Sequence, residues 1–363
     1  MANVFWFGGK GSWSDAANHW SNNSGNSPVS LHGAAPGTDD NATFDANSGT
    51  GTCTVKSGST CLDFVTTNTS LLTIAGTDDL SVYGNFTLQT GMTYSNTDNL
   101  IFRAASGTKT ITTNAISISA AINIIANAAA TIQLGGNFTT PKYFNFDTGN
   151  FDAKGYNLTA LSMNITSAGT RNMTLGIGTW TFTGTGNVLN ITNTTNLTFN
   201  ATGSTIIVSD TSATTKAFVG GGQTFDIVTF SGDNITISDN NIFGTLNVNT
   251  AGRTNGLKVT IDSIQTVTKF TTNGYDSNLA KMVSSSAGSH FHITTASAQI
   301  SVNYMSIKDS TADQANTWYA GANSTNVSGN SNWIFTDPPS GGSGSQRSSG
   351  IVSLASLQNF KSI

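Results

Sequence analysis

Glutamate is absent from this chain of 363 residues: all 19 acidic side chains are aspartates, set among many Thr, Asn, Ser and Gly residues. Glutamate favours helices, whereas Thr favours strands and Asn, Asp, Ser and Gly favour turns. Short runs alternate polar and apolar side chains and then stop at Gly, Asn or Asp, as in 196–199, 234–237 and 245–248. Alternation with a period of two is typical of strands with one buried face. The sequence therefore predicts a succession of short β-strands.

The composition indicates a folded protein with a low density of charge. Hydrophobic residues make up 37% of the chain and charged residues 9%, a balance that favours a packed core over disorder. The net charge is -4, and the 15 basic residues are scattered without clusters. Because nucleic acids and anionic membranes bind basic patches, we expect neither as a partner.

Residues 1–10 lack the basic segment, the long apolar segment and the cleavage site of a secretory signal. No run approaches the roughly 18 apolar residues of a membrane-spanning helix. We therefore expect synthesis in the cytoplasm without export by the usual route. The two cysteines, Cys53 and Cys61, could close a hairpin through a disulfide or remain two reduced thiols in a strand and its neighbour, and cytosolic assembly favours the thiols.

Weak internal repeats suggest that the strands form a solenoid. Gly-Asn-Phe recurs at 84–86, 136–138 and 149–151, and the segment 72–82 resembles 228–237. The spacing fits coils of roughly twenty-odd residues but is irregular, as expected for a parallel β-helix. About a dozen coils stacked ~4.8 Å apart would make a rod on the order of 60 Å long, with Leu, Ile, Val and Phe inside and Asn and Thr stacked between coils. We predict an all-β, right-handed parallel β-helix; a β-sandwich or jelly-roll array is the alternative, disfavoured because Asn-Gly hairpin turns are scarce.

The tryptophans gather near the two ends of the chain. Trp6, Trp13 and Trp20 lie near the start, and Trp318 and Trp333 lie near residue 335. The first and last coils of a solenoid would otherwise expose apolar faces and unpaired strand edges. We therefore expect aromatic capping regions at both ends.

The chain divides into four segments. We assign residues 1–50 to an N-terminal capping region, 51–335 to the β-helix and 336–345, rich in Pro, Gly and Ser, to a flexible linker. Residues 346–363 regain apolar side chains in a segment too short to fold alone, so we predict a peptide that docks on a partner by strand addition or as a helix in a groove; a frayed tail without function is the alternative. The proposed docking side chains are Ile351, Val352, Leu354, Leu357, Phe360 and Ile363.

Aspartates are the first candidates for catalysis, because glycoside hydrolysis uses two carboxyl groups held ~5 to 9.5 Å apart. The clusters are Asp39-Asp40, Asp78-Asp79 and the set Asp226, Asp233 and Asp239. The two pairs lie in turns rich in Gly and Thr, where Asp commonly hydrogen-bonds nearby backbone. We therefore assign no catalytic residue, and keep the set of three as candidates for a glycan depolymerase.

His290 and His292 are the candidates for a metal site. They flank Phe291 on a predicted strand, so both side chains would point to the same face. Two imidazoles at this spacing could chelate a metal, and a three-fold axis would bring six together, in an arrangement that resembles the His-x-His iron sites of trimeric phage spike tips. Here the pair lies far from the C-terminus, and we favour surface histidines without a metal.

Cofactor motifs are absent from the sequence. Gly220-Gly221-Gly222 lacks the Lys-Ser/Thr that would follow in a phosphate-binding loop, and we expect a corner of the fold there. Neither a Gly-x-Ser-x-Gly motif nor a calcium-binding loop is present. We predict no cofactor.

The two ends of the chain resemble a known group of proteins. The similarity is to β-solenoid surface proteins of phage virions, of the fibre, spike and decoration type, and to bacterial β-helical adhesins. It rests on the segments 5–21, 36–45, 241–248, 265–268, 302–310, 317–320 and 333–335. The resemblance implies a structural or adhesive role and transfers no active-site residue. Bacterial members carry export and anchoring segments, whereas this sequence shows neither, which favours a phage protein.

We therefore predict a non-enzymatic structural component of a phage virion, a fibre, spike or capsid decoration protein displayed on the particle surface. Capsid or tail proteins of the same particle would be its partners, host surface glycan a further contact, and a homotrimer its assembly. It would be synthesised in the host cytoplasm and located in the virion. The alternatives are a tailspike polysaccharide depolymerase and a bacterial surface adhesin.

Overall fold

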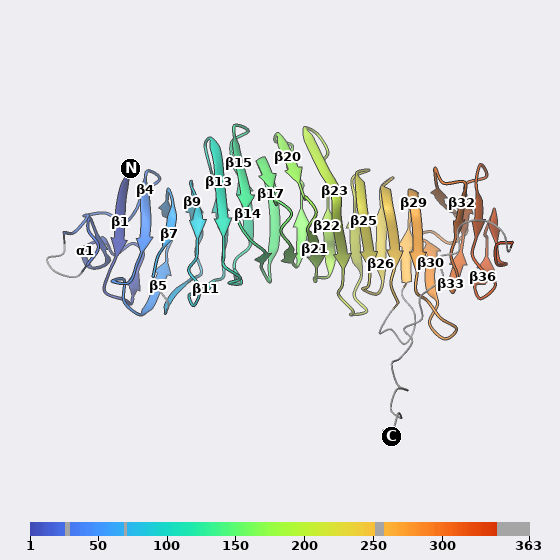
Figure 1. The fold of residues 1–363 in the computed structure, drawn as a ribbon, viewed down its shortest axis with the longest axis horizontal. Coiled ribbons are helices and arrows are strands. Elements are labelled where there is room, and N and C mark those ends of the chain that lie inside the picture. The colour runs from blue at the N-terminus through green and yellow to red at the C-terminus, as the bar shows by residue number, and fades with distance from the viewer. Residues whose placement is uncertain (26–29, 69–70, 251–257, 340–363) are drawn as a thin grey trace, which may run out of the picture.

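The computed structural model describes residues 1–25, 30–68, 71–250 and 258–339. The chain winds into an elongated parallel β-solenoid of about 13 turns (Figure 1). Among the described strands, the only antiparallel pairing joins β1 (Ala2–Trp6) to β3 (Trp20–Ser21). This architecture confirms the predicted parallel solenoid over the sandwich or jelly-roll alternative. The single described helix, α1 (Ala16–His19), spans four residues, and no described helix has the length and apolar character needed to cross a membrane.

Each coil passes through up to three strand positions, which we call faces 1, 2 and 3. Face 1 contains β1, β4 (Asp40–Phe44), β7 (Phe64–Thr66), β10 (Phe86–Thr87), β13 (Gly107–Thr112), β15 (Ala130–Leu134), the second half of β17 (Tyr143–Asp152), β20 (Arg171–Thr174) and the first residues of β23 (Leu197–Val208). Face 2 contains β6 (Ser59–Cys61), β9 (Leu80–Val82), β12 (Leu100–Phe102), β14 (Ile122–Ile125), the first half of β17, β19 (Ser162–Asn164), β22 (Gly186–Asn190), β24 (Lys216–Val219), β26 (Ile235–Ser238), β28 (Lys258–Ile261), β30 (Ala280–Ser284), β33 (Met305–Lys308) and β36 (Thr325–Ser328).

Face 3 changes its construction along the rod. It begins as a separate sheet of β2 (Gly11–Ser12), β5 (Gly51–Val55), β8 (Leu72–Gly76) and β11 (Thr93–Asn96), and continues with β16 (Phe138–Thr139), β18 (Leu158–Ala160), β21 (Thr179–Phe182) and the last residues of β23. Next, the long strands β25 (Thr224–Phe230), β27 (Ile242–Val248) and β29 (Ile264–Thr272) follow β23. The last coils add β31 (Phe291–Thr294) and β34 (Ser310–Ala312) beside β29, and a sheet of β32 (Gln299–Ser301), β35 (Thr317–Tyr319) and β37 (Trp333–Ile334).

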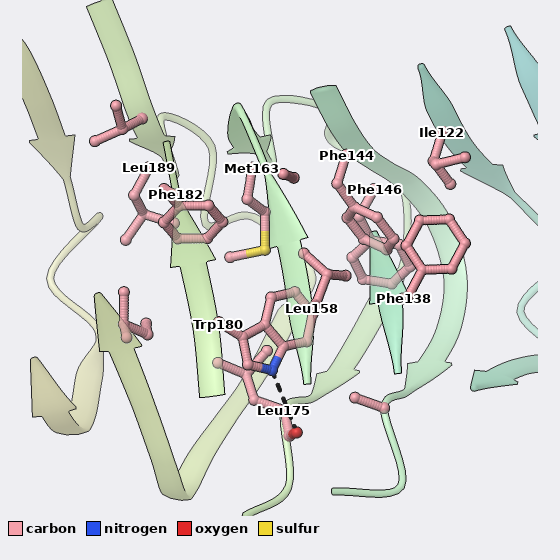
Figure 2. Packing of buried hydrophobic residues seen from close by; sticks show 14 of the residues in the cluster. Ile122, Phe138, Phe144, Phe146, Leu158, Met163, Leu175, Trp180, Phe182 and Leu189 are labelled. Atoms are coloured by element: carbon pink, nitrogen blue, oxygen red, sulfur yellow. Dashed lines mark hydrogen bonds between the residues drawn. The ribbon is translucent and has the colours of Figure 1, made fainter. Parts of the chain in front are cut away.

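Alternation within each strand builds the core. In β15 the side chains alternate between buried and partly exposed along the whole strand, and β14 shows the same pattern. The buried residues of successive coils then stack into one continuous cluster, seen around Trp180 in Figure 2. The Trp180 indole donates a hydrogen bond of 3.5 Å to the carbonyl of Leu175, so its polar atom is satisfied inside the core. Each fully buried large apolar side chain contributes about 1.5–3 kcal/mol.

Aromatic clusters occupy both ends, as predicted. Near the N-terminus the ring of Trp20 lies 5.1 Å from that of Trp6 and 5.1 Å from that of Trp13, and all three side chains are buried. Near the other end the rings of Trp318 and Trp333 lie 5.3 Å apart in an edge-to-face arrangement. These bulky rings cover the apolar interior at the first and last coils, where no further described coil stacks on it.

Coil length varies, which explains the irregular repeats. Asn99 hydrogen-bonds Asp79 at a separation of 20 residues, whereas Thr294 bonds Thr266 at a separation of 28. Extra residues are accommodated in the turns, where the paired strands remain in register, and in bulges such as the one between Ala201 and Thr205. The register is therefore set by the stacked strands and not by a fixed repeat length.

A ladder of polar side chains runs along face 2. Each asparagine donates from its amide nitrogen to the side-chain oxygen of the member one coil earlier, at distances from 2.8 to 3.4 Å. The members are Asp79, Asn99, Asn123, Asn145, Asn164 and Asn190. This observation confirms the expected stacking of Asn side chains between coils. From Asn123 to Asn190 the members are direct register partners on successive strands, so each amide can satisfy its neighbour without leaving the surface of the sheet.

Candidate functional site

The two cysteines belong to the core. Cys53 on β5 and Cys61 on β6 are both free and buried. Burial raises the pKa of each thiol above its usual value, because the charged thiolate is poorly solvated there. Neither thiol is therefore suited to nucleophilic chemistry in the folded protein.

The histidine pair lies on the surface near the far end of the rod. His290 precedes β31 and its Nδ1 lies 2.8 Å from the Thr311 hydroxyl, while His292 on β31 pairs with Thr311 through the backbone. Both imidazoles are exposed. No group of three or more His, Cys or Asp side chains that could hold a metal occurs in the described stretches of the chain.

The predicted carboxylates bind backbone amides. Asp226 accepts a hydrogen bond of 2.6 Å from the amide of Gly203, and Asp239 accepts one of 2.8 Å from the amide of Gly221. Asp233 accepts from the amides of Asn234 and Lys258, at 2.7 and 3.1 Å. Asp226 thus binds the irregular part of β23 at Gly203, whereas Asp233 and Asp239 lie in turns, and no hydrogen bond among the described residues connects the three carboxylates. The six proposed docking side chains, from Ile351 to Ile363, lie outside the described residues.

The earlier pairs of aspartates also have structural partners. Asp40 accepts a hydrogen bond of 3.3 Å from the Gly37 amide within its own turn. Asp79 accepts from the side chain of Asn99 at 2.8 Å and so begins the face 2 ladder. Asp40 therefore binds its own turn, as predicted, whereas Asp79 binds a residue of the next coil.

Two buried cations hold loop carbonyls. Arg171 donates to the carbonyls of Gly169, Asn193 and Thr195, at distances from 2.8 to 3.1 Å, and its side chain is fully buried. Burial lowers the pKa of Arg171, and the charge of Asp147 opposes that shift. These bonds tie the loop after Ile191 to the preceding coil, which is a structural role.

Lys216 has a similar structural role in the following coil. Its ammonium lies 2.9 Å from the Asp210 carboxylate and donates to the carbonyls of Ser212 and Asp233. Partial burial raises the pKa of Asp210, but hydrogen bonds from Ser212 and Lys216 outweigh that effect and leave the pKa lowered. The ion pair stabilises the loop between β23 and β24.

The solenoid changes its cross-section at β23. Residues 197–200 pair with β20 on the preceding coil, but pairing with the following strand β25 starts only at Ala201. Among the described strands, none continues face 1 beyond residues 197–200. A four-residue strand edge is therefore left open on the side of the rod.

A groove forms beside this open edge. Its cavity volume is about 340 Å³. It is lined by Phe199, Asn200, Ala201, Thr202, Thr224, Phe225, Asp226, Ile242, Gly244 and Thr268. The partly exposed ring of Phe199 lies 5.6 Å from the buried ring of Phe225, edge to face, so the core holds it in place. The groove thus joins an apolar floor to a polar rim.

Glycines follow the corner of the rod beside the groove. Gly203 has a φ of 80°, and a Cβ there would lie 2.9 Å from Cγ2 of Ile177 on the preceding coil. A Cβ at Gly244 would lie 3.0 Å from Oδ1 of Asp226. Ile177, Gly203, Asp226 and Gly244 therefore follow one another along one corner of the rod. Ile177 and Asp226 project because their neighbours are glycines.

Sequence reasoning identified Asp226 but not the groove. The available signal was the absence of an apolar strand pattern in 209–215 and 220–223, the segments that precede and follow β24. Gly220-Gly221-Gly222, predicted as a corner, joins β24 to β25, and Gly221 lies against Ile191, which follows β22 on the preceding coil. Counting missing strands requires the register, which a single sequence does not supply.

Fold and groove together describe a parallel β-solenoid whose face 1 ends beside a groove. Comparison with known protein families, with curated proteins and with solved structures gives no match to this chain.

Proposed function

We propose that the protein is a non-enzymatic structural rod of a phage virion, a fibre, spike or capsid decoration protein displayed on the particle surface. A β-solenoid fold is compatible with a structural surface protein. The observation that carries the proposal is the continuous parallel pairing from β1 to β36 over a single core, which makes a long and stiff body. The resemblance of both ends to virion β-solenoids supports the assignment to a phage.

The use of the charged groups favours a structural role over catalysis. Asp226, Asp233 and Asp239 hold backbone amides, and Lys216 and Arg171 hold carbonyls. Asp226 is the only acidic side chain among the groove-lining residues, whereas glycoside hydrolysis uses two carboxyl groups. We therefore rank the depolymerase below the structural rod.

The docking hypothesis provides the test. The full chain and a variant ending at residue 336 are expressed with an affinity tag during particle production, and particles are separated on a density gradient. The full chain is expected to sediment with particles, whereas the shortened chain should remain in the free fraction with an unchanged circular dichroism spectrum. Normal incorporation of the shortened chain would refute the docking role of 337–363, and absence of the full chain from particles would refute the virion assignment.

The predicted homotrimer is tested separately by sedimentation equilibrium of the purified chain. A mass three times that of the 37.6 kDa chain supports the trimer, and a monomer mass contradicts it.

A further inference from the structure

We propose that the groove between Phe199 and Asp226 is a binding site for a neutral or amino-substituted saccharide. The inference rests on the proposed function, because a displayed rod meets surface glycans, and it gives that contact a place and a chemistry. The groove lies where the stacked strands of face 1 end.

The apolar floor suits the C–H face of a sugar ring. Phe199 is partly exposed and is held edge to face by Phe225 at 5.6 Å, so its ring has a fixed orientation. Ile242 on β27 has 43% of its surface exposed at the same groove. A sugar ring that packs here removes apolar surface from water on both partners, and because Phe199 is already ordered the loss of side-chain entropy is small.

The rim offers both kinds of hydrogen-bonding group. Asp226 uses one of its acceptor sites on the Gly203 amide, and a carboxylate has about four such sites. The side-chain oxygen of Asn200 accepts from the Thr202 amide at 3.0 Å, which leaves the amide nitrogen as the group that can donate to a ligand. The hydroxyls of Thr224 and Thr268 both donate and accept. Saccharide hydroxyls are also donors and acceptors, so the two surfaces are complementary.

Charge narrows the class of saccharide. Asp226 is the only ionised side chain that lines the groove, so its floor and rim carry a single negative charge. A uronic acid or sialic acid would bring a second carboxylate close to it, which is unfavourable. A neutral hexose or an amino sugar meets no such repulsion.

The corner beside the groove extends the site along the rod. Ile177 has 81% of its surface exposed and lies against Gly203, whose amide binds Asp226. A chain of two or more sugar rings that begins at Phe199 can therefore continue over Ile177. This geometry predicts tighter binding of oligosaccharides than of monosaccharides.

A saccharide fits the groove better than an added peptide strand. The open edge covers only residues 197–200, and the side chain of Asn200 already binds the Thr202 amide at one end of it. Recognition by strand addition takes its affinity from a row of main-chain hydrogen bonds, for which four residues are short.

The test is a glycan array that carries neutral, amino and uronic-acid oligosaccharides, followed by calorimetric titration of the purified full chain with the neutral or amino oligosaccharide that binds best. We expect Phe199→Ala and Asp226→Asn each to weaken that binding by about tenfold or more, as for loss of a packed ring or a charged acceptor. Ile242→Ser is measured as well, so that a folding defect of Phe199→Ala does not decide the outcome.

Two control variants match the test variants. Asp239→Asn also changes a carboxylate that accepts a hydrogen bond from a backbone amide, that of Gly221 at 2.8 Å. Asp239 does not line the groove. Tyr143→Ser removes an exposed aromatic ring from β17, which does not line the groove. Both are expected to bind within about twofold of the unchanged chain.

Three results overturn the inference: no neutral or amino glycan is bound, only acidic glycans are bound, or the groove variants bind as well as the controls. Particle sedimentation separates this failure from failure of the proposed function. A chain that joins particles but binds no glycan refutes only the saccharide site, whereas a chain that binds glycan but never joins particles refutes only the virion assignment.

Discussion

The coils before and after β23 follow different rules. From Asp79 to Asn190 each coil repeats the polar contact of the coil before it, and face 1 is continued at every turn. Both regularities end within one coil. Asn190 pairs with Val219, which cannot continue the ladder, and residues 197–200 have no strand beyond them among the described residues.

The difference shows where a solenoid can carry a site. Where successive coils match, each side chain is covered or bonded by its equivalent, and little surface is left for a ligand. Where the match fails, a strand edge, a partly exposed ring and a carboxylate become accessible together. A ligand site is therefore expected where successive coils do not match. The difference between the two regions can be tested by mutation.

The largest contrast is expected between two phenylalanines. The ring of Phe64 lies 5.0 Å from that of Phe44 and 4.9 Å from that of Phe86 inside the regular stack, so Phe64→Ala should lower the free energy of unfolding by about 3–5 kcal/mol. Phe199→Ala, in the partly exposed strand that ends face 1, should lower the free energy of unfolding by about 1–2 kcal/mol, because the Phe199 ring buries less surface. Urea unfolding followed by tryptophan fluorescence measures both free energies. Equal losses would mean that Phe199 is packed as tightly as Phe64.

Lys216→Met tests whether the buried ion pair stabilises the loop between β23 and β24. It removes the buried partner of Asp210, whose side chain is 24% exposed, and leaves two carbonyls without their donor. We expect a loss of about 1–3 kcal/mol in urea unfolding. The matched control is Lys154→Met, which breaks an exposed pair of 3.8 Å with Asp152 and should cost about 0.5 kcal/mol or less. A loss as small as that of the control would show that the buried pair does not stabilise the loop.

The same variant should alter the response to acid. The pKa of Asp210 is lowered in the folded chain from its usual value of 3.8, so its contribution to stability is present above that value and disappears as the pH falls through the folded pKa. The unchanged chain should therefore lose this contribution below about pH 4, and Lys216→Met should lose less over the same range. Thermal unfolding between pH 3 and 6 measures the stability of both chains. If the two chains lose stability in parallel as the pH falls, the Asp210–Lys216 pair is not the source of this contribution.

Much of the fold could be predicted from the sequence because alternation and turn residues are local. The repeated Gly-Asn-Phe motifs do begin strands with buried phenylalanines at Phe86 and Phe138. They could not give the register, since Phe86 pairs with Ile111 on face 1 whereas Phe138 pairs with Leu158 on face 3. Residues that look equivalent in sequence therefore occupy different sides of the coil.

The site was less predictable for a related reason. Asp226 could be selected as an acidic residue, but its role at the groove depends on two features that the sequence does not show: its bond to Gly203 one coil earlier and the missing strand beside Phe199. These are relations between coils, and variable coil length hides them. The histidine pair illustrates the opposite case, because its proximity in sequence suggested a site although both side chains are exposed and His290 binds Thr311.

Asn145→Val tests the regular ladder at its centre. Asn145 donates to Asn123 and accepts from Asn164, both at 2.8 Å, so the substitution removes one hydrogen bond from each neighbour. We expect a loss of about 1–3 kcal/mol, the sum of two modest hydrogen bonds reduced by the strand preference of Val. Urea unfolding measures the loss, and a neutral result would show that water replaces the ladder at no cost.

Asn190→Val tests the end of the same ladder and should have the smallest effect. Asn190 makes one long contact of 3.4 Å with Asn164, and its buried side-chain oxygen has no partner in the described structure. Val would lose that weak bond but would relieve the buried oxygen and pack beside Val219 in a strand that favours β-branched residues. A change within about 0.5 kcal/mol is expected, whereas a loss equal to that of Asn145→Val would mean that the ladder continues past Asn190 and that the two regions do not differ there.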